Sequence, residues 1–215
     1  MNLERMLKEG AEELGIKLST KNINNFIIYL EELKIWSKKI NLTGLKKDED
    51  IITNHFLDSL SILKYLKEDS TLLDIGTGAG FPGVPISIVC PGCFVTVLDS
   101  AQKKILFIRN IIRRLSLRNV KAITGRAEVE QNNLKRKSFD YVVTRAVSDF
   151  YNVMKLSSPY LNEDGRMIVM RGEKGELELE AMSKEIENLE LSVDKIDVFN
   201  LPFNESKRVS IILKK

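Results

Sequence analysis

The sequence has few of the residues that build metal sites, disulfide scaffolds and membrane spans. Its 215 residues include two cysteines, one histidine and one tryptophan. Two cysteines are too few for a disulfide scaffold or a four-cysteine zinc site, and one histidine, His55, excludes His-rich metal sites and disfavours hydrolase triads. No apolar run approaches the ~20 residues of a transmembrane helix, and residues 1–10 lack the apolar centre of a signal peptide. We therefore expect a cytoplasmic protein without a metal and without a membrane partner.

The remaining composition is that of a globular protein with an uneven charge. Hydrophobic residues make up 43% and charged residues 29% of the chain, and the net charge is only +3. Residues 71–172 carry 15 basic and 8 acidic side chains, whereas the segments on either side are slightly acidic. A basic middle segment predicts an anionic partner, although an ordinary solvated surface gives the same count.

The first 70 residues have the apolar spacing of helices, and the rest alternates between strands and helices. Residues 51–66 are expected to form one helix, because the acidic residues 48–50 favour a helix start. Short apolar runs that suit strands follow at residues 72–75, 94–98, 120–123, 139–144, 167–170, 193–199 and 208–214. We expect a helical N-terminal extension over residues 1–70 and a domain over residues 71–215.

The order of these runs predicts an α/β fold. Helical stretches at residues 82–89, 101–115 and 150–161 separate strand-like runs, and this alternation implies a parallel sheet with right-handed crossovers. The last two runs are joined by a short turn, which requires antiparallel pairing. The sheet is therefore expected to be mostly parallel and to end in an antiparallel hairpin.

A glycine-rich loop is the most informative stretch of the chain. Residues 72–83 read LLDIGTGAGFPG, so that a strand enters the loop, a helix leaves it, and Asp99 follows about twenty residues later. Gly76 and Gly78 let the backbone approach a ligand closely, and Asp99 can accept hydrogen bonds from ribose hydroxyls. A dinucleotide or S-adenosylmethionine suits this pattern. Asp74 favours S-adenosylmethionine, because a carboxylate attracts a sulfonium and repels a pyrophosphate.

Two further strand ends supply candidate site residues. Residues 125–128 end the third strand, where Glu128 can bind an adenine amino group and Ala127 can offer its backbone, although the same residues suit an ordinary helix start. Arg145 ends the fourth strand, beside the expected position of the reacting methyl group. It can bind a methionine carboxylate, a guanine edge or a phosphate, or it can form a structural pair with Asp140 or Asp149.

The atom that would accept a methyl group from S-adenosylmethionine is inferred from motifs that the sequence lacks. No Pro-Pro-aromatic sequence, as found in enzymes that methylate exocyclic amino groups, follows the fourth strand, and Cys90 and Cys93 lie too early to attack a pyrimidine. Their Cys-x-x-Cys spacing can be redox-active, but it lacks a following strand–helix start, so we expect ordinary thiols. Guanine N7 has a free lone pair and needs positioning rather than a general base.

Basic side chains that suit an RNA backbone lie along the expected second helix of the domain: Lys103, Lys104, Arg109, Arg113, Arg114 and Arg118.

Several motifs together resemble one known family. Residues 73–83 (LDIGTGAGFPG) are similar to the cofactor loop of the ribosomal RNA small-subunit methyltransferase G family, also called glucose-inhibited division protein B. Residues 41–43 (NLT), 55–60 (HFLDSL), 126–128 (RAE) and 144–146 (TRA) match its pattern in the same order, within a similarity that covers about residues 30–172.

The resemblance implies S-adenosylmethionine-dependent methylation of guanine N7 in 16S ribosomal RNA, by a seven-stranded Rossmann-like class I methyltransferase. It implies cofactor contacts for Gly76, Phe81, Ala127, Glu128 and Arg145, beside the Gly78 and Asp99 contacts expected from the loop itself. We assign the catalytic role to Arg145.

Three matched or neighbouring positions stay outside this assignment. His55 and Asp58 lie in a matched stretch without an assigned role. Arg171 stands where the family commonly has Lys, which keeps the charge but not the geometry.

Three alternatives stay open at this point. The chain can be a methyltransferase of the same fold that acts on another RNA position or on a small molecule. It can be a noncatalytic RNA-assembly factor that keeps a cofactor loop. A nicotinamide-dependent oxidoreductase is disfavoured by Asp74 and by the lack of a visible proton donor.

Overall fold

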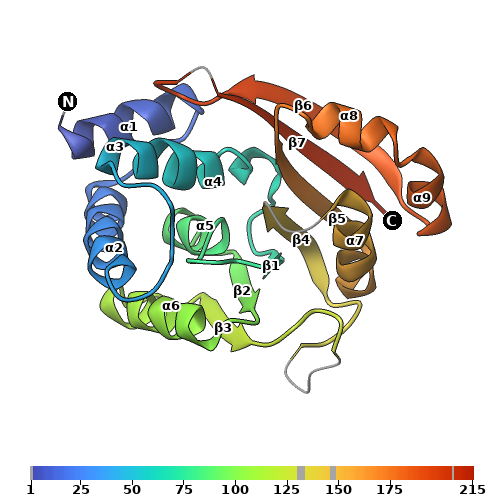
Figure 1. Ribbon diagram of the computed structural model, residues 1–215, viewed down its shortest axis with the longest axis horizontal. Helices are drawn as coiled ribbons and strands as arrows, with labels where there is room; N and C mark the ends of the chain where they lie inside the picture. The colour runs from blue at the N-terminus through green and yellow to red at the C-terminus, as the bar shows by residue number, and fades with distance from the viewer. Residues whose placement is uncertain (1, 130–133, 146–148, 205) are drawn as a thin grey trace.

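The computed structural model describes residues 2–129, 134–145, 149–204 and 206–215. Within these residues the strands form a seven-stranded sheet in the order β3-β2-β1-β4-β5-β7-β6 (Figure 1). The strands are β1 (Thr71–Ile75), β2 (Phe94–Asp99), β3 (Val120–Thr124), β4 (Phe139–Arg145), β5 (Leu161–Gly172), β6 (Ser192–Asn200) and β7 (Lys207–Lys214). Strands β1 to β5 pair in parallel, and β7 runs antiparallel to both β5 and β6. The expected sheet is confirmed.

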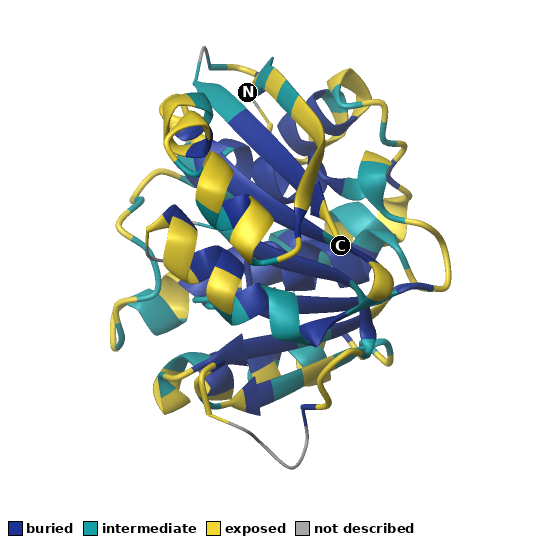
Figure 2. Cartoon of the chain, turned by 90° about the vertical axis from the view of Figure 1, so that its right-hand side faces the viewer, coloured by how far each residue is buried: buried dark blue, intermediate teal, exposed yellow. Residues whose placement is uncertain are grey.

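Helices cover both faces of the sheet (Figures 1 and 2). The α-helices of at least six residues are α1 (Leu3–Glu13), α2 (Thr20–Ser37), α5 (Gly83–Val89), α6 (Gln102–Arg114), α7 (Phe150–Ser157), α8 (Gly175–Glu180) and α9 (Ser183–Asn188). Short elements are α3 (Asp48–Ile51), η1 (Ile52–Leu57), α4 (Asp58–Leu60), η2 (Leu63–Tyr65) and η3 (Ser158–Tyr160). One core joins α1, α2, α5 and α6 to the sheet, and a second core lies under α7, α8 and α9.

The alternation of side chains along the strands divides them between these two cores. In β1, Leu72 belongs to the core under α5, and Leu73 and Ile75 belong to the core under α7. Strands in the middle of the sheet are covered on both faces, which explains their nearly continuous apolar sequences. The carboxyl ends of β1, β2 and β4 lie side by side along one edge of the sheet, because their registers match.

The helix expected over residues 51–66 is replaced by several short elements. Residues 52–57 form a π-helix, η1, between α3 and α4, and a 3₁₀ turn ends the segment. The fully or nearly fully buried pairs Ile51/Ile52 and Phe56/Leu57 recur five residues apart, which suits the i→i+5 bonding of a π-helix better than an α-helix. This wider turn places Asn54, His55 and Asp58 near the end of β4.

Other differences concern the second half of the chain and the cysteines. The run at residues 167–170 is the buried centre of the longer strand β5, and α8 and α9 are helices that the sequence did not predict. The prediction of ordinary thiols is wrong, because Cys90 and Cys93 form a disulfide around the turn at Pro91, with Cα atoms 5.4 Å apart. Ala146, part of the matched TRA motif, lies outside the described residues.

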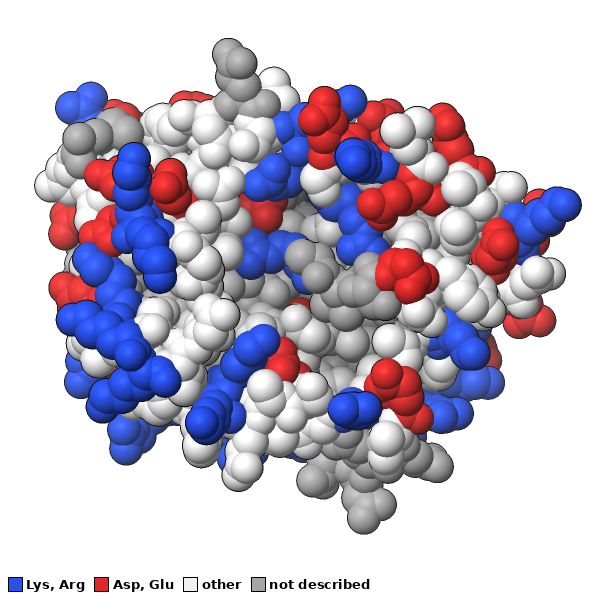
Figure 3. All heavy atoms as spheres, in the orientation of Figure 1, with Lys and Arg blue, Asp and Glu red and all other residues white. Residues whose placement is uncertain are grey.

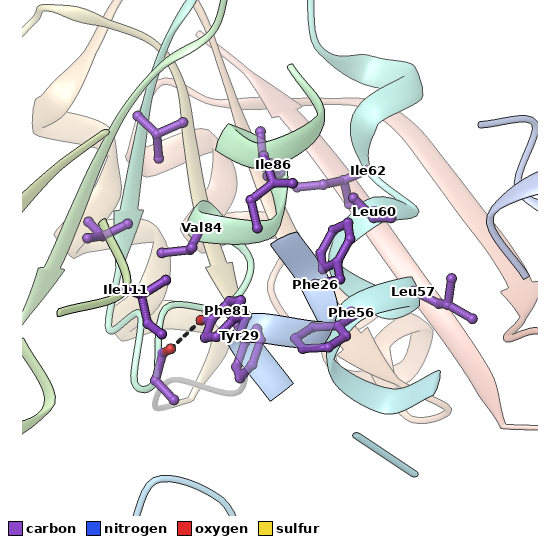
Figure 4. Packing of buried hydrophobic residues seen from close by; sticks show 14 of the residues in the cluster. Phe26, Tyr29, Phe56, Leu57, Leu60, Ile62, Phe81, Val84, Ile86 and Ile111 are labelled. Carbon is purple, nitrogen blue, oxygen red and sulfur yellow. Dashed lines mark hydrogen bonds between the residues drawn. The ribbon is translucent and has the colours of Figure 1, made fainter. Parts of the chain in front are cut away.

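Aromatic rings join the N-terminal helices to the glycine loop, residues 76–83. Phe26 and Tyr29 of α2 and Phe56 of η1 pack with Phe81 in one buried cluster (Figure 4). Each of these rings is at most 4% exposed. The core is therefore continuous across residues 70 and 71, and the division into two units at that point stays a prediction.

Candidate active site

The glycine loop follows β1 and leads into α5. Gly76, Gly78 and Gly80 have φ angles of 72°, 62° and 103°, a region that favours glycine. At Gly80 space is limited as well, because a Cβ atom would lie 2.5 Å from the Tyr29 hydroxyl oxygen. That hydroxyl donates a hydrogen bond of 2.5 Å to the carbonyl of Ala79 (dashed in Figure 4). The N-terminal helix α2 therefore fixes the backbone of the loop.

Asp74 supports the loop from beneath. Its Oδ2 atom accepts hydrogen bonds from the Thr77 hydroxyl at 2.5 Å and from the Gly83 backbone at 2.8 Å. The side chain is fully buried, and burial raises the pKa of Asp74 to about 6, against the lowering effect of these two bonds. We expected Asp74 to attract a cationic ligand, whereas its carboxylate lines neither of the two cavities described below. Its contacts are those of a loop support.

A cavity of about 240 Å³, the glycine-loop cavity, opens at the carboxyl ends of β1, β2 and β3. Its lining residues are Ile75, Gly76, Leu98, Asp99, Ser100, Gly125, Arg126, Ala127, Glu128 and Leu156. Four of the predicted cofactor residues, Gly76, Asp99, Ala127 and Glu128, therefore lie around one space.

Hydrogen bonds hold the walls of the glycine-loop cavity in place. Asp99 accepts from the Gly78 backbone at 2.9 Å and from the Ala101 backbone at 2.8 Å, which ties the loop to the end of β2. Gly78 thus adjoins the four residues that line the cavity. The Tyr160 hydroxyl donates to the carbonyl of Ala127 at 2.7 Å and fixes the segment after β3. Each carboxylate oxygen of Asp99 can accept a second hydrogen bond from a ligand.

A second cavity of about 490 Å³, the arginine cavity, lies at the carboxyl ends of β4 and β5. Its walls come from β4, β5, β7, the π-helix and the loop after α2. The lining residues are Thr43, Gly44, Leu45, Asn54, His55, Asp58, Arg145, Met170, Arg171, Gly172 and Arg208. Figure 3 shows Lys and Arg side chains around a hollow near the centre of this face of the molecule.

Arg145 is held at one wall of the arginine cavity by three groups. Its Nη1 atom donates to Asp58 Oδ2 and to the Asn54 carbonyl, both at 3.0 Å, and its Nη2 lies 3.1 Å from His55 Nδ1. The alternative of a structural pair with Asp140 or Asp149 is not the one observed. Asp140 binds Thr71 at the other end of β4, and Asp149 caps α7.

Asp58 joins Arg145 to a second arginine that the sequence analysis did not single out. Asp58 Oδ1 accepts from Arg208 Nε at 3.2 Å, and Asn54 Oδ1 accepts from Arg208 Nη2 at 3.1 Å. The Asp58 side chain is 7% exposed, so its carboxylate is a buried counter-charge shared by two guanidinium groups. Arg208 lies in β7, and no motif near it indicates this role.

His55 is neutral in this cluster. Burial first, and then the Arg145 guanidinium, lower the pKa of His55 to about 3. Nδ1 lies 3.1 Å from Arg145 Nη2, which can only donate, and 3.1 Å from the Asn54 carbonyl oxygen, which can only accept, and Nε2 lies 2.7 Å from the Thr43 hydroxyl. Both ring nitrogens are engaged, so the imidazole is not placed as an acid or a base.

Phe81 and Arg145 lie apart from the other predicted cofactor residues. The Phe81 ring is 4% exposed and stacks on His55, with ring centroids 4.5 Å apart, and the Arg145 guanidinium lies 5.1 Å from its centroid. The ring lines neither cavity. Arg171, 9% exposed, lies on the wall of the arginine cavity, where it pairs with Glu178 at 3.0 Å.

The basic residues expected to face RNA form part of a larger charged margin. Lys and Arg side chains gather along the left-hand margin of Figure 3, over α2 and α6. Some of them have protein partners: Arg114 pairs with Glu32 at 3.2 Å, and Arg109 donates to the Ala122 carbonyl at 3.3 Å. Some of the positively charged side chains of α6 are therefore engaged in contacts within the protein.

In the part of the chain that the structure describes, no three His, Cys, Asp or Glu side chains are grouped so that they could bind a metal ion. No helix among the same residues has the length and apolar character that crossing a membrane requires.

Comparison with known proteins identifies the family of the chain. The family model for rRNA small subunit methyltransferase G matches residues 22–207. A ribosomal RNA small subunit methyltransferase G of Geotalea uraniireducens is 38% identical over 212 residues, which cover 99% of this chain and 96% of that protein. The protein of the same name from Acetivibrio thermocellus is 38% identical over 217 residues, which cover 100% and 89% of the two chains.

Solved structures with low sequence identity share the fold. TYW2 from M. jannaschii, crystallised in complex with AdoMet, has a TM-score of 0.63 at 14% identity, over 82% of this chain and 78% of that one. A SAM-dependent methyltransferase from Aquifex aeolicus has a TM-score of 0.60 at 17% identity, over 86% and 97% of the two chains. The expected Rossmann-like methyltransferase fold is thus confirmed, and the chain belongs to the rRNA small subunit methyltransferase G family.

Proposed function

We propose that this protein transfers a methyl group from S-adenosylmethionine to N7 of a guanine in 16S ribosomal RNA. The observation that carries the proposal is the pairing of two cavities at one edge of the sheet. The glycine-loop cavity suits the cofactor, and the arginine cavity at the ends of β4 and β5 suits a nucleotide. Family membership supports the reaction, and the two cavities provide residues that would bind the cofactor and the acceptor nucleotide.

The glycine-loop cavity has the groups that an adenosine needs. Asp99 and Glu128 would accept hydrogen bonds from ribose hydroxyls and from the adenine amino group, and apolar side chains at Ile75, Leu98 and Leu156 would contact the ring. Gly76 and Gly78 would let the methionine part pass close to the backbone. Two carboxylates on the walls disfavour a pyrophosphate, because they would repel its negative charge.

The reaction needs no proton transfer from the protein. When bound, S-adenosylmethionine supplies an electrophilic methyl group, so that the N7–carbon bond forms as the sulfur–carbon bond breaks, and the positive charge passes from sulfur to the guanine. The only histidine is neutral and has both nitrogens engaged. The protein's part is therefore to position the acceptor and to exclude water.

Arg145 and Arg208 are the residues that would position the acceptor. Both guanidinium groups line the arginine cavity, and both are fixed by the buried carboxylate of Asp58. Two fixed arginines with one shared counter-charge leave a net positive charge, which suits a phosphodiester or the O6 edge of guanine. Arg145 ends β4, so we assign it the contact nearest to the reacting methyl group.

The proposal is tested by following the methyl group. The purified protein is incubated with labelled S-adenosylmethionine and either deproteinised 16S ribosomal RNA or small-subunit particles. The RNA is then digested to nucleosides, which are separated and identified by mass spectrometry. We expect label in N7-methylguanosine, with Asp99→Ala as a control that lowers the yield. Label in another nucleoside would favour a different methyltransferase activity, and RNA binding without any consumption of cofactor would favour an assembly factor.

A further inference from the structure

The Phe81 side chain touches the supports of both cavities. Its ring lies nearly parallel to that of Tyr29, at an interplanar angle of 17° with centroids 5.5 Å apart. It is nearly parallel to His55 as well, at 21° and 4.5 Å, and the guanidinium carbon of Arg145 lies 5.1 Å from the ring centroid. Tyr29, His55 and Arg145 come from three different elements, α2, η1 and β4, which therefore meet at this ring.

On the side of the cofactor, this cluster controls the backbone of the glycine loop. Tyr29 is fully buried and donates to the carbonyl of Ala79, which directly follows Gly78. A Cβ atom at Gly80 would lie 2.5 Å from the Tyr29 hydroxyl oxygen, so the loop and the tyrosine are in close contact over two residues. Because interiors are closely packed, a shift of the loop is transmitted to the Tyr29 and Phe81 rings.

On the side of the acceptor, the same ring supports the arginine cavity. His55 and Arg145 both contact Phe81 and are hydrogen-bonded to each other at 3.1 Å. Arg145 shares Asp58 with Arg208. A change in the position of the Phe81 ring therefore alters the support of the arginines that line this cavity.

We propose that Phe81 is a positioning residue, through which cofactor binding at the glycine loop strengthens RNA binding at the arginine cavity. The inference rests on the proposed function, since it needs both ligands. Linkage requires that RNA strengthens cofactor binding by the same factor. The ring acts through Tyr29, His55 and Arg145, without lying on the cofactor or on the acceptor nucleotide.

The test compares Phe81→Leu with Phe26→Leu. Phe26 is a matched control because it is a fully buried phenylalanine of the same cluster, whose ring is tilted by 46° against Phe56 and, among the described residues, makes no ring contact with Phe81, His55 or Arg145. Calorimetry gives the dissociation constant of S-adenosylmethionine with and without saturating 16S ribosomal RNA. We expect RNA to tighten cofactor binding by at least about fivefold in the wild type and in Phe26→Leu. In Phe81→Leu the factor should fall to less than about twofold.

A second measurement uses the only histidine as a reporter. The His55 ring signal in a proton NMR spectrum should shift when S-adenosylhomocysteine, the demethylated cofactor, saturates the wild type, and the shift should shrink in Phe81→Leu and in Tyr29→Phe. Tyr29→Phe removes one hydroxyl only, so it keeps the test usable if Phe81→Leu does not fold.

The outcomes separate this inference from the proposed function. A wild type that binds no S-adenosylmethionine, or that transfers no methyl group to RNA, contradicts the proposed function. A wild type that does both while Phe81→Leu keeps the same coupling factor as Phe26→Leu overturns the role of Phe81 and leaves the proposed function standing. Loss of coupling to the same extent in both variants would show a general packing effect, and would also overturn it.

Discussion

The single histidine allows a direct test of the electrostatics of the arginine cavity. Burial and the Arg145 guanidinium lower the pKa of His55 from 6.5 to about 3. We predict that His55 stays uncharged in the folded protein from pH 8 down to pH 5, whereas it takes up a proton in the unfolded chain. The variant that isolates this effect is His55→Gln, which keeps a polar side chain and cannot titrate.

The sign and size of the effect follow from linkage. Because the folded pKa of His55 lies below the unfolded value, the unfolded state binds more protons between pH 6.5 and 3, and stability is lost as the pH falls through this window. Each pH unit well inside the window costs about 1.4 kcal/mol, so lowering the pH from 7 to 5 costs about 2 kcal/mol. For a chain of this size that amounts to about 4–8 °C in Tm.

Another buried group titrates in the same pH range, and its contribution to the pH dependence of stability must be subtracted. The pKa of Asp74 is raised from 3.8 to about 6, so its folded form holds a proton that the unfolded form has lost. Its contribution to stability is present below pH 3.8 and is lost as the pH rises towards 6, which opposes the His55 effect. Asp74 is retained in His55→Gln, and the difference between the two proteins therefore reports on His55.

The assay is urea unfolding of both proteins at pH 7 and pH 5, together with an NMR titration of the histidine ring. Between these two pH values the wild type should lose about 2 kcal/mol more than His55→Gln, and its ring signal should show no inflection above pH 5. An inflection near pH 6.5, or an equal loss in both proteins, would refute the assignment of a neutral, arginine-bound imidazole.

Three further predictions concern the glycine loop and β4. Gly80→Ala should lower the free energy of unfolding by about 1–3 kcal/mol, because its φ is 103° and the added Cβ would meet the Tyr29 hydroxyl; urea titration measures this loss. Asp99→Ala removes the bond to the Gly78 backbone and should weaken cofactor binding about 10–100-fold by calorimetry, so unchanged affinity would place the ribose elsewhere. Arg145→Ala should lower single-turnover methylation about 10²–10³-fold with the fold intact by circular dichroism, and unchanged turnover would remove Arg145 from the site.

The features that could be read from the sequence are those with local signals. The loop between β1 and α5 is marked by an apolar run, three closely spaced glycines and a helix start within twelve residues. Parallel strands then bring their carboxyl ends to one edge, which is why Gly76, Asp99, Ala127 and Glu128 could be placed around one cavity without coordinates.

The features that could not be read depend on contacts between distant segments. Asp58 and Arg145 are 87 positions apart, and Asp58 and Arg208 are 150 apart, so no spacing rule joins them. The π-helix that carries His55 and leads into α4 at Asp58 looks like an ordinary amphipathic helix in the sequence, because its wider turn depends on packing against the core. Phe81 belongs to a recognisable motif, but only the structure shows that it lines neither cavity and stacks on His55.

The central claim is methyl transfer to guanine N7 in small-subunit ribosomal RNA. The most direct measurement maps N7-methylguanosine along 16S ribosomal RNA from cells that contain this protein and from cells that lack it. As controls, the wild type and the Arg145→Ala variant are each expressed in the cells that lack the protein. We predict one N7-methylguanosine that disappears without the protein, returns with the wild type, and stays reduced with Arg145→Ala. An identical map with and without the protein would contradict the claim.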